Sequence, residues 1–346
     1  MMRVAVVSGS GRTAQEIGAY CHDALRGLGH DARQWVHVPD RGAGILPTFA
    51  LRYFRRFHDR RLDAVLLRFQ PEVVLVIKGQ DLDPSHLGTL RREMKSIWVN
   101  WWIDDPGLLA ASRRLSPAYD LFLTNDPTAI EEHRRAGARN VDWLTFGCDP
   151  RVHRPLRLSP RLRRRYGCDV IFAGSLTPRR VEMLAPLVPL GLALWADPEI
   201  RWLQEDGGIG FLALPKNNPL QGARRGNFIW GENLAAAYSA SRICVNVHSH
   251  GAYDVNMRVF EAAACGTLVV TEDRPMVREL FTVDGPEAEV AVYSNARELT
   301  EKVEYFLAHE DERRAVAIRG MERARRDHTY ECRMKRVLSL LSGVSA

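Results

Sequence analysis

The sequence predicts a protein of two α/β domains, each built on a parallel β-sheet that helices cover on both faces. Apolar runs such as Val73–Ile77, Leu121–Thr124 and Leu192–Trp195 are bounded by glycine or polar residues and separated by helical segments, the pattern of buried parallel strands. A length of 346 residues is more than one hydrophobic core usually needs. Residues 146–155 contain a glycine and two prolines, and the alternation restarts after them, so we expect the domain boundary there.

The composition is that of an ordinary soluble protein, with 46% hydrophobic and 26% charged residues. No apolar run is long enough to span a bilayer, and residues 1–8 have the pattern of a first strand rather than of a signal peptide, which predicts a cytoplasmic protein. The six cysteines are scattered without C-x-x-C spacing. We therefore expect reduced, mostly buried thiols, with neither a disulfide framework nor a zinc site.

The net charge of +6 is carried almost wholly by arginine and is concentrated in residues 52–61 and 161–165. One interpretation is a solvated helix face and a linker. The other is a surface that meets an anionic partner, either a membrane-bound molecule or an acidic glycan, which would bring the protein to the inner face of the membrane. No nucleic-acid-binding module accompanies the charge, so we expect no nucleic acid as partner.

In the first half, residues 4–7 form a strand that leads through Gly9 and Gly11 into a helix over residues 13–28. Strand, glycine turn and helix open many nucleotide-binding folds, because glycine lets a backbone approach a phosphate. The fingerprint G-x-G-x-x-G is incomplete, since Ala14 stands at its last position. The turn by itself is weak evidence for nucleotide binding.

Two loops follow strands of the first half, at the sheet edge where parallel α/β proteins bind ligands. One begins at Lys78, which we expect to contact a substrate, and the other is residues 101–106, with Asp104 and Asp105. A carboxylate of the second loop could have a raised pKa suited to proton transfer. The alternative is structural, with Asp105 as the N-cap and Pro106 at the first position of the next helix.

The second half opens with a strand and a loop suited to an anion. Gly174 permits close approach to the backbone, and Ser175 lies beside it. Thr177 as N-cap and Pro178 at the first helical position predict where the next helix begins. Two cations that could point toward an anion follow at the helix start, Arg179 and Arg180. The alternative is an ordinary capped helix with surface arginines.

The rest of the chain is organised around residues 249–271, which predict one helix between two apolar strands. Asn256 is the expected N-cap and Gly266 the expected end. Arg258 and Glu261 stand three residues apart, so they project from one side near the amino end, where backbone N–H groups favour an anion. The pair suits a nucleotide sugar, with Arg258 on a phosphate oxygen and Glu261 on the ribose hydroxyls. The alternative is an ion pair on a solvated helix face.

Residues 256–266, NMRVFEAAACG, with His328-Thr-Tyr330 downstream, resemble the signature of the spore maturation protein CgeB family of glycosyltransferases, within the wider group of two-domain GT-B enzymes. The resemblance implies a GT-B fold, with two Rossmann-like parallel-sheet domains and a cleft between them. From it we expect an acceptor-side domain over residues 1–147, a hinge over residues 148–156 and a donor domain over residues 157–327. Residues 328–346 are expected to form a C-terminal helix that packs back on the first domain.

The resemblance also implies roles for single residues. Glu261 would hold the donor ribose, the loop at Gly174 would bind the donor pyrophosphate, and Gly9 and Gly11 would lie across the cleft from the donor. The connector at residues 146–155 is similar to Gly-x-Asp-x-x-x-Phe-x-Pro, with His153 in place of the usual Phe.

The chain departs from the resembled pattern at two places. The wider family 4 enzymes have a second Glu at the position of Tyr253, and Asp254 is the residue expected to take its role. In related retaining enzymes a His often stands near the acceptor in the loop that here contains Asp104, so Asp104 is the hypothetical acid or base. Trp230 either contacts the base of the donor or is a core aromatic.

The function implied is metal-independent transfer of a sugar from a nucleotide diphosphate sugar to an unidentified acceptor, anionic or membrane-associated, without a cofactor. Arg258, with Arg179 or Arg180, would stabilise the charge of the departing diphosphate. The sequence shows no metal-ligand spacing. Two alternatives stay open, a nucleotide-sugar epimerase of the same fold and a non-catalytic nucleotide-sugar-binding protein.

Overall fold

The computed structural model describes residues 1–37, 48–203, 209–249, 251 and 253–344. The chain divides into two compact units. The first comprises Met1–Thr145 with Tyr330–Ala346, and the second comprises Phe146–Thr329. Each unit has its own sheet and its own hydrophobic core.

The first unit is built on a six-stranded parallel sheet of order β2-β1-β3-β4-β5-β6. Its strands are β1 (Arg3–Ser8), β2 (Asp31–Val36), β3 (Val73–Ile77), β4 (Ile97–Trp102), β5 (Leu121–Thr124) and β6 (Val141–Trp143). Its helices are α1 (Arg12–Gly27), α2 (Thr48–Phe69), α3 (Pro84–Glu93), α4 (Leu109–Leu115), α5 (Ile130–Arg135) and α14 (Tyr330–Leu341), with short 3-10 turns η1 (Ser116–Ala118) and η2 (Pro127–Ala129).

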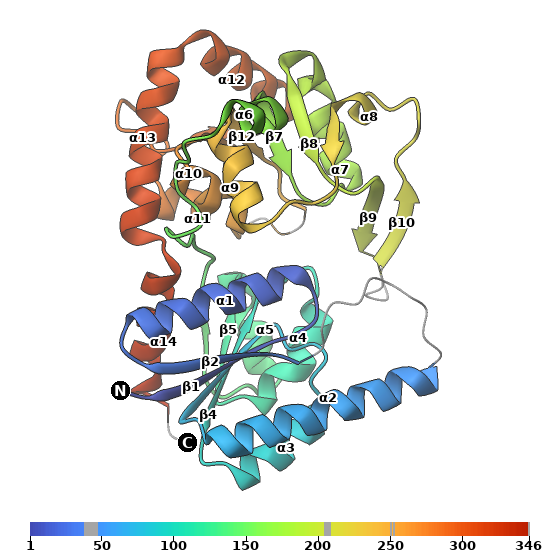
Figure 1. Ribbon diagram of the computed structural model, residues 1–346, viewed down its shortest axis with the longest axis vertical. Helices are drawn as coiled ribbons and strands as arrows, with labels where there is room; N and C mark the ends of the chain where they lie inside the picture. The colour runs from blue at the N-terminus through green and yellow to red at the C-terminus, as the bar shows by residue number, and fades with distance from the viewer. Residues whose placement is uncertain (38–47, 204–208, 250, 252, 345–346) are drawn as a thin grey trace. The chain divides into compact units, whose positions relative to one another are not determined.

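Helices cover both faces of this first sheet, with α1 on one side and α2 and α3 on the other (Figure 1). Val7 and Val76 face a core that Leu66 of α2 and Leu87 of α3 complete. Because side chains alternate along a strand, their neighbours in sequence face α1, on which α14 packs. Burial on both faces explains why the inner strands are apolar throughout.

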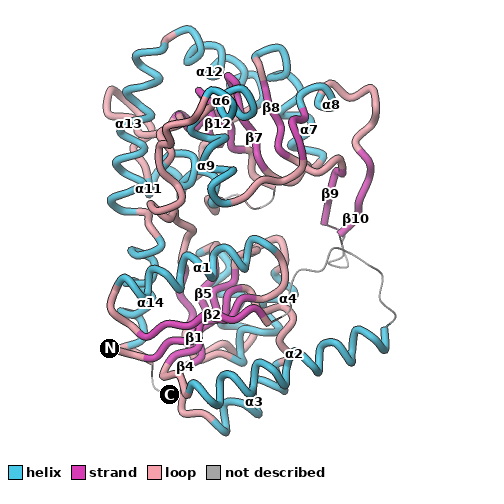
Figure 2. Tube along the Cα trace, in the orientation of Figure 1, coloured by secondary structure: helices cyan, strands magenta, loops and turns pink. Residues whose placement is uncertain are grey.

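The second unit also has a six-stranded parallel sheet, of order β11-β8-β7-β12-β13-β14. Its strands are β7 (Cys168–Ala173), β8 (Leu192–Trp195), β11 (Arg224–Gly226), β12 (Ser241–Asn246), β13 (Leu268–Glu272) and β14 (Ala291–Tyr293), and β9 (Glu199–Leu203) pairs with β10 (Ile209–Ala213) in a separate antiparallel ribbon (Figure 2). Its helices are α6 (Pro160–Tyr166), α7 (Pro178–Leu184), α8 (Leu220–Ala223), α9 (Gly231–Ser239), α10 (Met257–Ala264), α11 (Pro275–Leu280), α12 (Ala296–Ala308) and α13 (Glu310–Asp327), with the 3-10 segment η3 (Ala185–Leu190).

Helices cover both faces of the second sheet as well. Phe172 and Val245 face a core that Leu184 of α7 and Val303 of α12 complete. The opposite face is covered by α9 and α10. The α/β fold with two parallel sheets that the sequence predicts is confirmed.

Two segments of the second unit have local structure that their sequence does not make obvious. Leu280 ends α11 and Phe281 is its C-cap, and Phe281 packs against Phe260 and His328. The polar residues 217–226 contain α8 and the edge strand β11, which pairs with β8.

The arginine-rich segments fall on helices. Residues 161–165 form the exposed part of α6, rather than a linker. Residues 52–61 lie in α2, and the side chains of residues 52–56 are outside the described part of the structure. None of the helices in the described ranges is both long and apolar enough to cross a bilayer.

The chain passes from one unit to the other twice. Within the second unit the two passages are joined, because the Cys148 N–H donates to the His328 carbonyl at 2.8 Å and Cys148 forms a parallel bridge with Thr329. Within the first unit, Nε of Arg333 donates to the Thr145 carbonyl at 3.0 Å. In each unit, hydrogen bonds therefore join the two chain segments that lead to the other unit.

Candidate functional site

The carboxyl ends of three neighbouring strands of the second unit bring polar residues to one sheet edge. Gly174 follows β7, Asn246 ends β12 and Glu272 ends β13. Ligands of parallel α/β sheets bind at this edge, because the loops there leave backbone groups and helix amino ends open to the ligand. The candidate site of the second unit is therefore at this edge.

Helix α10 begins at the same edge. The side chain of Asn256 is its N-cap and accepts a hydrogen bond from the Arg258 backbone N–H at 3.1 Å, which confirms the predicted helix start. The Asn256 amide also donates to Oδ1 of Asn246 at 2.8 Å. This bond fixes the first turn of α10 against the end of β12.

The Arg258 side chain is only 7% exposed and turns back under the loop that follows β7. Its Nε and Nη2 donate to the Ala173 carbonyl at 2.9 and 2.7 Å, and its Nη1 donates to Oδ1 of Asn246 at 2.6 Å. A Cβ at residue 174 would lie 2.3 Å from the Arg258 Nη2, and the φ of Gly174 is +153°. Glycine is required at 174 because the guanidinium occupies the space that a side chain would fill.

Arg180 is equally buried and lies on the same aromatic ring. Its Nε donates to the Val247 carbonyl at 2.8 Å and its Nη1 to the Ser175 carbonyl at 2.9 Å. The guanidinium carbons of Arg180 and Arg258 lie 5.4 and 4.5 Å from the centroid of Phe172. Burial, followed by the charge of Arg258, lowers the pKa of Arg180 to about 9.

Across the described chain, neither Arg180 nor Arg258 forms an ion pair with a carboxylate. Fully buried arginines are ordinarily paired with an acid, because an uncompensated charge away from water is costly. An anionic ligand at this edge of the sheet would stabilise the two guanidinium groups that lie on the Phe172 ring.

Glu272 holds the other cations of this edge. Its carboxylate oxygens lie 2.8 Å from Nη2 of Arg179, 2.9 Å from Nη2 of Arg274 and 3.0 Å from Nδ1 of His248. Burial raises the pKa of Glu272, but the hydrogen bond of His248 and the charges of Arg274 and Arg179 outweigh it and lower the pKa to about 2. Arg179 is thus paired with Glu272, whereas Arg180 is the buried arginine that has no carboxylate partner in the described chain.

His248 and Asp254 complete this network. Burial lowers the pKa of His248 to about 4, so its ring is neutral at pH 7 and donates to Glu272. Oδ1 of Asp254 lies 2.9 Å from Nη1 of Arg274, and both side chains are buried. Asp254, expected to replace a missing Glu, therefore orients Arg274.

Glu261 faces the connector rather than the arginine pair. It is 4% exposed, and its Oε1 lies 3.7 Å from Nε2 of His153. Nδ1 of His153 accepts a hydrogen bond from the Asp149 N–H at 3.0 Å. Burial, opposed by the charge of Asp149, lowers the pKa of His153 to about 4.

Trp230 is the N-cap of α9, in the segment that connects β11 to that helix. Its ring centroid lies 5.9 Å from that of Phe228, whose ring is contacted by the Arg201 guanidinium at 5.5 Å. Because β8 lies between β11 and β7 in the sheet, Trp230 belongs to a second cluster of the same edge.

In the first unit, Lys78 and Asp104 meet at the carboxyl edge of the sheet. Lys78 follows β3, Asp104 follows β4, and Nζ lies 2.6 Å from Oδ2. Lys78 has φ of +63°, and its turn is fixed because its N–H donates to the Trp101 carbonyl and its carbonyl accepts from Nδ2 of Asn100. A non-glycine residue held in the left-handed region is often part of a functional site.

Gly9 and Gly11 have different structural roles, and only Gly9 is packed against this turn. The Gly9 N–H donates to the Ile77 carbonyl at 3.1 Å, and a Cβ at Gly9 would lie 2.9 Å from the Gly79 nitrogen. Gly11, with φ of +97°, is the N-cap of α1. The glycine turn therefore packs closely against the turn that contains Lys78.

The expected helix start at Asp105 and Pro106 is wrong. Helix α4 begins at Leu109, and the Asp105 carboxylate is fully buried. It accepts hydrogen bonds from the Ser112 hydroxyl at 2.6 Å and the Thr124 hydroxyl at 2.8 Å, and it lies 2.8 Å from Nε2 of His133. Asp105 holds three elements together, which leaves Asp104 as the carboxylate available for chemistry.

Three buried polar residues of the site are missed by sequence reasoning, namely Asn246, His248 and Glu272. The signal that could have found them is a polar residue at the end of an otherwise apolar strand. That signal becomes useful only with the strand order, because it is the adjacency of β12 and β13 that brings these side chains together.

Residues 157–339 match the family model described as glycosyl transferase-like. No curated protein sequence matches the chain.

Among solved structures, the chain is similar to sucrose-phosphate synthase from Thermosynechococcus elongatus, with 15% identity, a TM-score of 0.67 and 99% of each chain covered. It is also similar to HepE from Anabaena, solved with UDP and glucose, with 12% identity, a TM-score of 0.66 and coverage of 99% of this chain and 100% of that one. The catalytic domain of starch synthase IV from Arabidopsis thaliana, solved with ADP and acarbose, matches with 10% identity, a TM-score of 0.68 and 99% of each chain covered. These likenesses show that the fold is that of the GT-B glycosyltransferases.

Proposed function

The chain belongs to the glycosyl transferase-like family, and from that membership we propose that it transfers a sugar from a nucleotide diphosphate sugar to a hydroxyl acceptor. The donor is proposed to bind at the edge of the second unit that holds Arg180 and Arg258, and the acceptor to bind the first unit. Assignment to the CgeB branch rests on the resemblance of residues 256–266 to that family.

One observation carries the proposal, namely the two buried guanidinium groups of Arg180 and Arg258 that have no carboxylate partner within the described chain. A nucleotide diphosphate would supply the missing negative charge at the sheet edge where such ligands bind. Each charge-assisted hydrogen bond to phosphate would contribute about 1.5 to 3 kcal/mol.

In the proposed reaction, a hydroxyl oxygen of the acceptor attacks the anomeric carbon of the donor sugar. The bond from that carbon to the β-phosphate oxygen breaks, its electron pair leaves with the nucleoside diphosphate, and the hydroxyl proton passes to a base. Arg258 and Arg180 would stabilise the charge that develops on the leaving group, so the proposal requires no divalent cation.

The remaining roles are proposed from position and resemblance. Asp104 is the proposed base, and Lys78 would hold its carboxylate in place. Glu261 is proposed to bind the ribose hydroxyls and Trp230 to contact the nucleobase. The arginine-rich helix α2 in the first unit supports an anionic acceptor.

The donor site is tested by thermal shift and calorimetry of the full chain with UDP, UDP-glucose, ADP, GDP, dTDP and CDP. UDP and ADP come first, because HepE was solved with UDP and starch synthase IV with ADP. A nucleotide at about one hundred times its Kd adds about 2.7 kcal/mol to the unfolding free energy. Arg258→Gln and Gly174→Ala are expected to weaken binding by about tenfold or more, since each removes or displaces the same guanidinium.

The matched control is Arg297→Gln, because the Arg297 side chain is 88% exposed on α12 and should leave nucleotide affinity unchanged. Absence of binding by every nucleotide, or equal losses for Arg258→Gln and Arg297→Gln, would refute the donor site. Product analysis then separates two activities, because an epimerase converts the nucleotide sugar alone, whereas a transferase releases nucleoside diphosphate only with an acceptor.

A further inference from the structure

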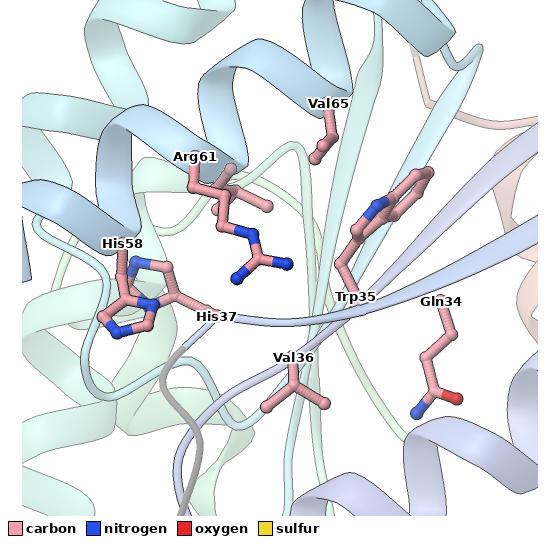
Figure 3. A pocket seen from close by; sticks show the side chains of 8 residues that line it. Gln34, Trp35, Val36, His37, His58, Arg61 and Val65 are labelled. Atoms are coloured by element: carbon pink, nitrogen blue, oxygen red, sulfur yellow. The ribbon is translucent and has the colours of Figure 1, made fainter.

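A pocket lies in the first unit, between the carboxyl end of β2 and helix α2 (Figure 3). Its volume is about 370 Å³, within the usual range of small-molecule sites. Its lining residues are Gln34, Trp35 and Val36 from β2, His37 directly after β2, and His58, Arg61, Leu62 and Val65 from α2. The His37 N–H donates to the Ser8 carbonyl at 3.0 Å, so the pocket is at the same sheet edge as the loop that contains Gly9.

Arg61 supplies a positive charge to this pocket. Its side chain extends from α2 toward β2 and ends between Trp35 and the two histidines (Figure 3). In the described chain Arg61 forms no ion pair, whereas Lys78 and Arg91 of the same unit are each paired with an aspartate. A guanidinium directed into a pocket without a carboxylate is suited to an anionic ligand.

His37 provides an independent observation. It is 2% exposed, and its Nε2 lies 2.7 Å from Oδ1 of Asp59. Its Nδ1 is buried and has no hydrogen-bond partner among the residues that the structure describes. Buried polar atoms nearly always have a partner, so this unmatched atom of a pocket-lining residue indicates a ligand that would supply one.

The other wall of the pocket is apolar. Trp35 is half-buried, and Leu62 and Val65 face it from α2. The sequence of α2 has six arginines against two aspartates, so the surroundings of the pocket favour negative charge. A free phosphate would use the cation but leave the apolar wall in contact with water.

We propose that this pocket binds an amphipathic organic anion, with its phosphate or carboxylate on Arg61, a donor group on Nδ1 of His37 and its apolar or aromatic body on Trp35. This site goes beyond the proposed donor site, because all of its residues belong to the first unit. It is tested by direct binding and does not require sugar transfer.

The experiment measures calorimetric binding of phenyl phosphate, benzoate, inorganic phosphate and phenol to the full chain. Phenyl phosphate or benzoate should bind at least tenfold more tightly than inorganic phosphate and phenol. Arg61→Gln should weaken that binding about tenfold, whereas Arg60→Gln, the adjacent exposed arginine that does not line the pocket, should leave it unchanged. 4-Hydroxybenzoate, which adds a hydroxyl donor for Nδ1 of His37, should bind more tightly than benzoate, and His37→Phe should remove that gain. Trp35→Phe should remove any change in tryptophan fluorescence.

Each contrary result overturns the proposal. Equal weakening by Arg60→Gln and Arg61→Gln would assign the effect to the general charge of α2. Inorganic phosphate that binds as tightly as phenyl phosphate would show that the apolar wall is unused, and no binding by either organic anion would remove the site. Failure of these tests leaves nucleotide binding by the second unit unaffected, so the two proposals are separable.

Discussion

His153 stands in the connector where the resembled family usually has Phe, and its surroundings make it sensitive to acid. It is fully buried, its Nδ1 accepts the Asp149 N–H, and its Nε2 lies 3.7 Å from the Glu261 carboxylate. Burial lowers its pKa to about 4. The ring is therefore neutral at pH 7, and protonating it requires either water inside the connector or loss of structure.

His153→Phe should make the second unit less sensitive to acid. The folded pKa is about 4 and the ordinary value is 6.5, so between these values the unfolded chain binds a proton that the folded chain does not. The unfolding free energy should therefore fall as pH falls through this window, by up to about 3 kcal/mol. His248 has a similarly lowered pKa and contributes a slope of the same sign, so the substitution reduces the slope without abolishing it.

Urea unfolding at pH 7, 6 and 5 measures this slope. His309→Phe is the matched control, because His309 is exposed and its replacement should leave the pH dependence unchanged. A slope that is the same in His153→Phe and wild type would show that His153 titrates normally in the folded protein. A constant offset between the two proteins does not bear on the prediction, because the lost Asp149 hydrogen bond accounts for it.

At the scale of elements, the loop after β4 gives two adjacent aspartates opposite environments. Asp105 is buried between α4, β5 and α5 and is contacted by Ser112, Thr124 and His133. Asp104 is 32% exposed and is paired with Lys78. The buried residue fixes the loop, and the loop presents Asp104 at the sheet edge.

Asp105→Asn should destabilise the first unit by about 3 kcal/mol, because an amide nitrogen would face hydrogen-bond donors in a buried site. Asp104→Asn is the matched control, since the ion pair of Asp104 with Lys78 is partly exposed to water, and ion pairs at the surface contribute only about 0 to 1 kcal/mol. Urea unfolding should separate the two variants, and the proposed sugar transfer should be lost with Asp104→Asn at nearly wild-type stability. Similar losses of stability in both variants would contradict the distinction.

At the scale of the whole molecule, the last helix belongs to the unit that contains the first strand. The Tyr330 ring of α14 lies 5.1 Å from that of Tyr20 and 6.2 Å from that of Trp101, and Arg336 lies 2.7 Å from Asp142. The core of the first unit is therefore complete only after the second unit has been synthesised. Both ends of the sequence therefore contribute to the stability of the first unit, and the residues between them contribute to the stability of the second unit.

Met334→Ala should lower the unfolding free energy of the first unit by about 2 to 5 kcal/mol, because Met334 is fully buried in that unit. The transition of the second unit should stay within error of wild type. Calorimetry gives the two transitions, and hydrogen exchange in peptides from residues 1–145 assigns the affected one. Lys335→Ala, at an exposed neighbouring position, is the control, and equal shifts of both transitions in Met334→Ala would refute the assignment of α14 to the first unit alone.

The local sequence was sufficient for the inner strands and for several helix starts. Strands β3, β5 and β8 are apolar throughout because both faces of each sheet are covered, and that pattern is visible without a structure. Asn256 and Thr177 cap their helices as predicted, because capping depends only on residues two or three positions away. Strands β2 and β11 were not predicted, since edge strands are half exposed and lack the apolar pattern.

The site itself was only partly determined by the sequence. Asn256, Arg258 and Gly174 could be proposed from spacing and resemblance, because they lie at the ends of predicted elements. The order of β7, β12 and β13 in the sheet decides which arginine is buried beside Arg258, namely Arg180 and not Arg179. The same strand order places Glu272 between Arg179 and His248. Sequence specifies each strand and helix through local contacts, whereas the charge and burial of a side chain are set by neighbours that only the tertiary fold brings within a few ångströms.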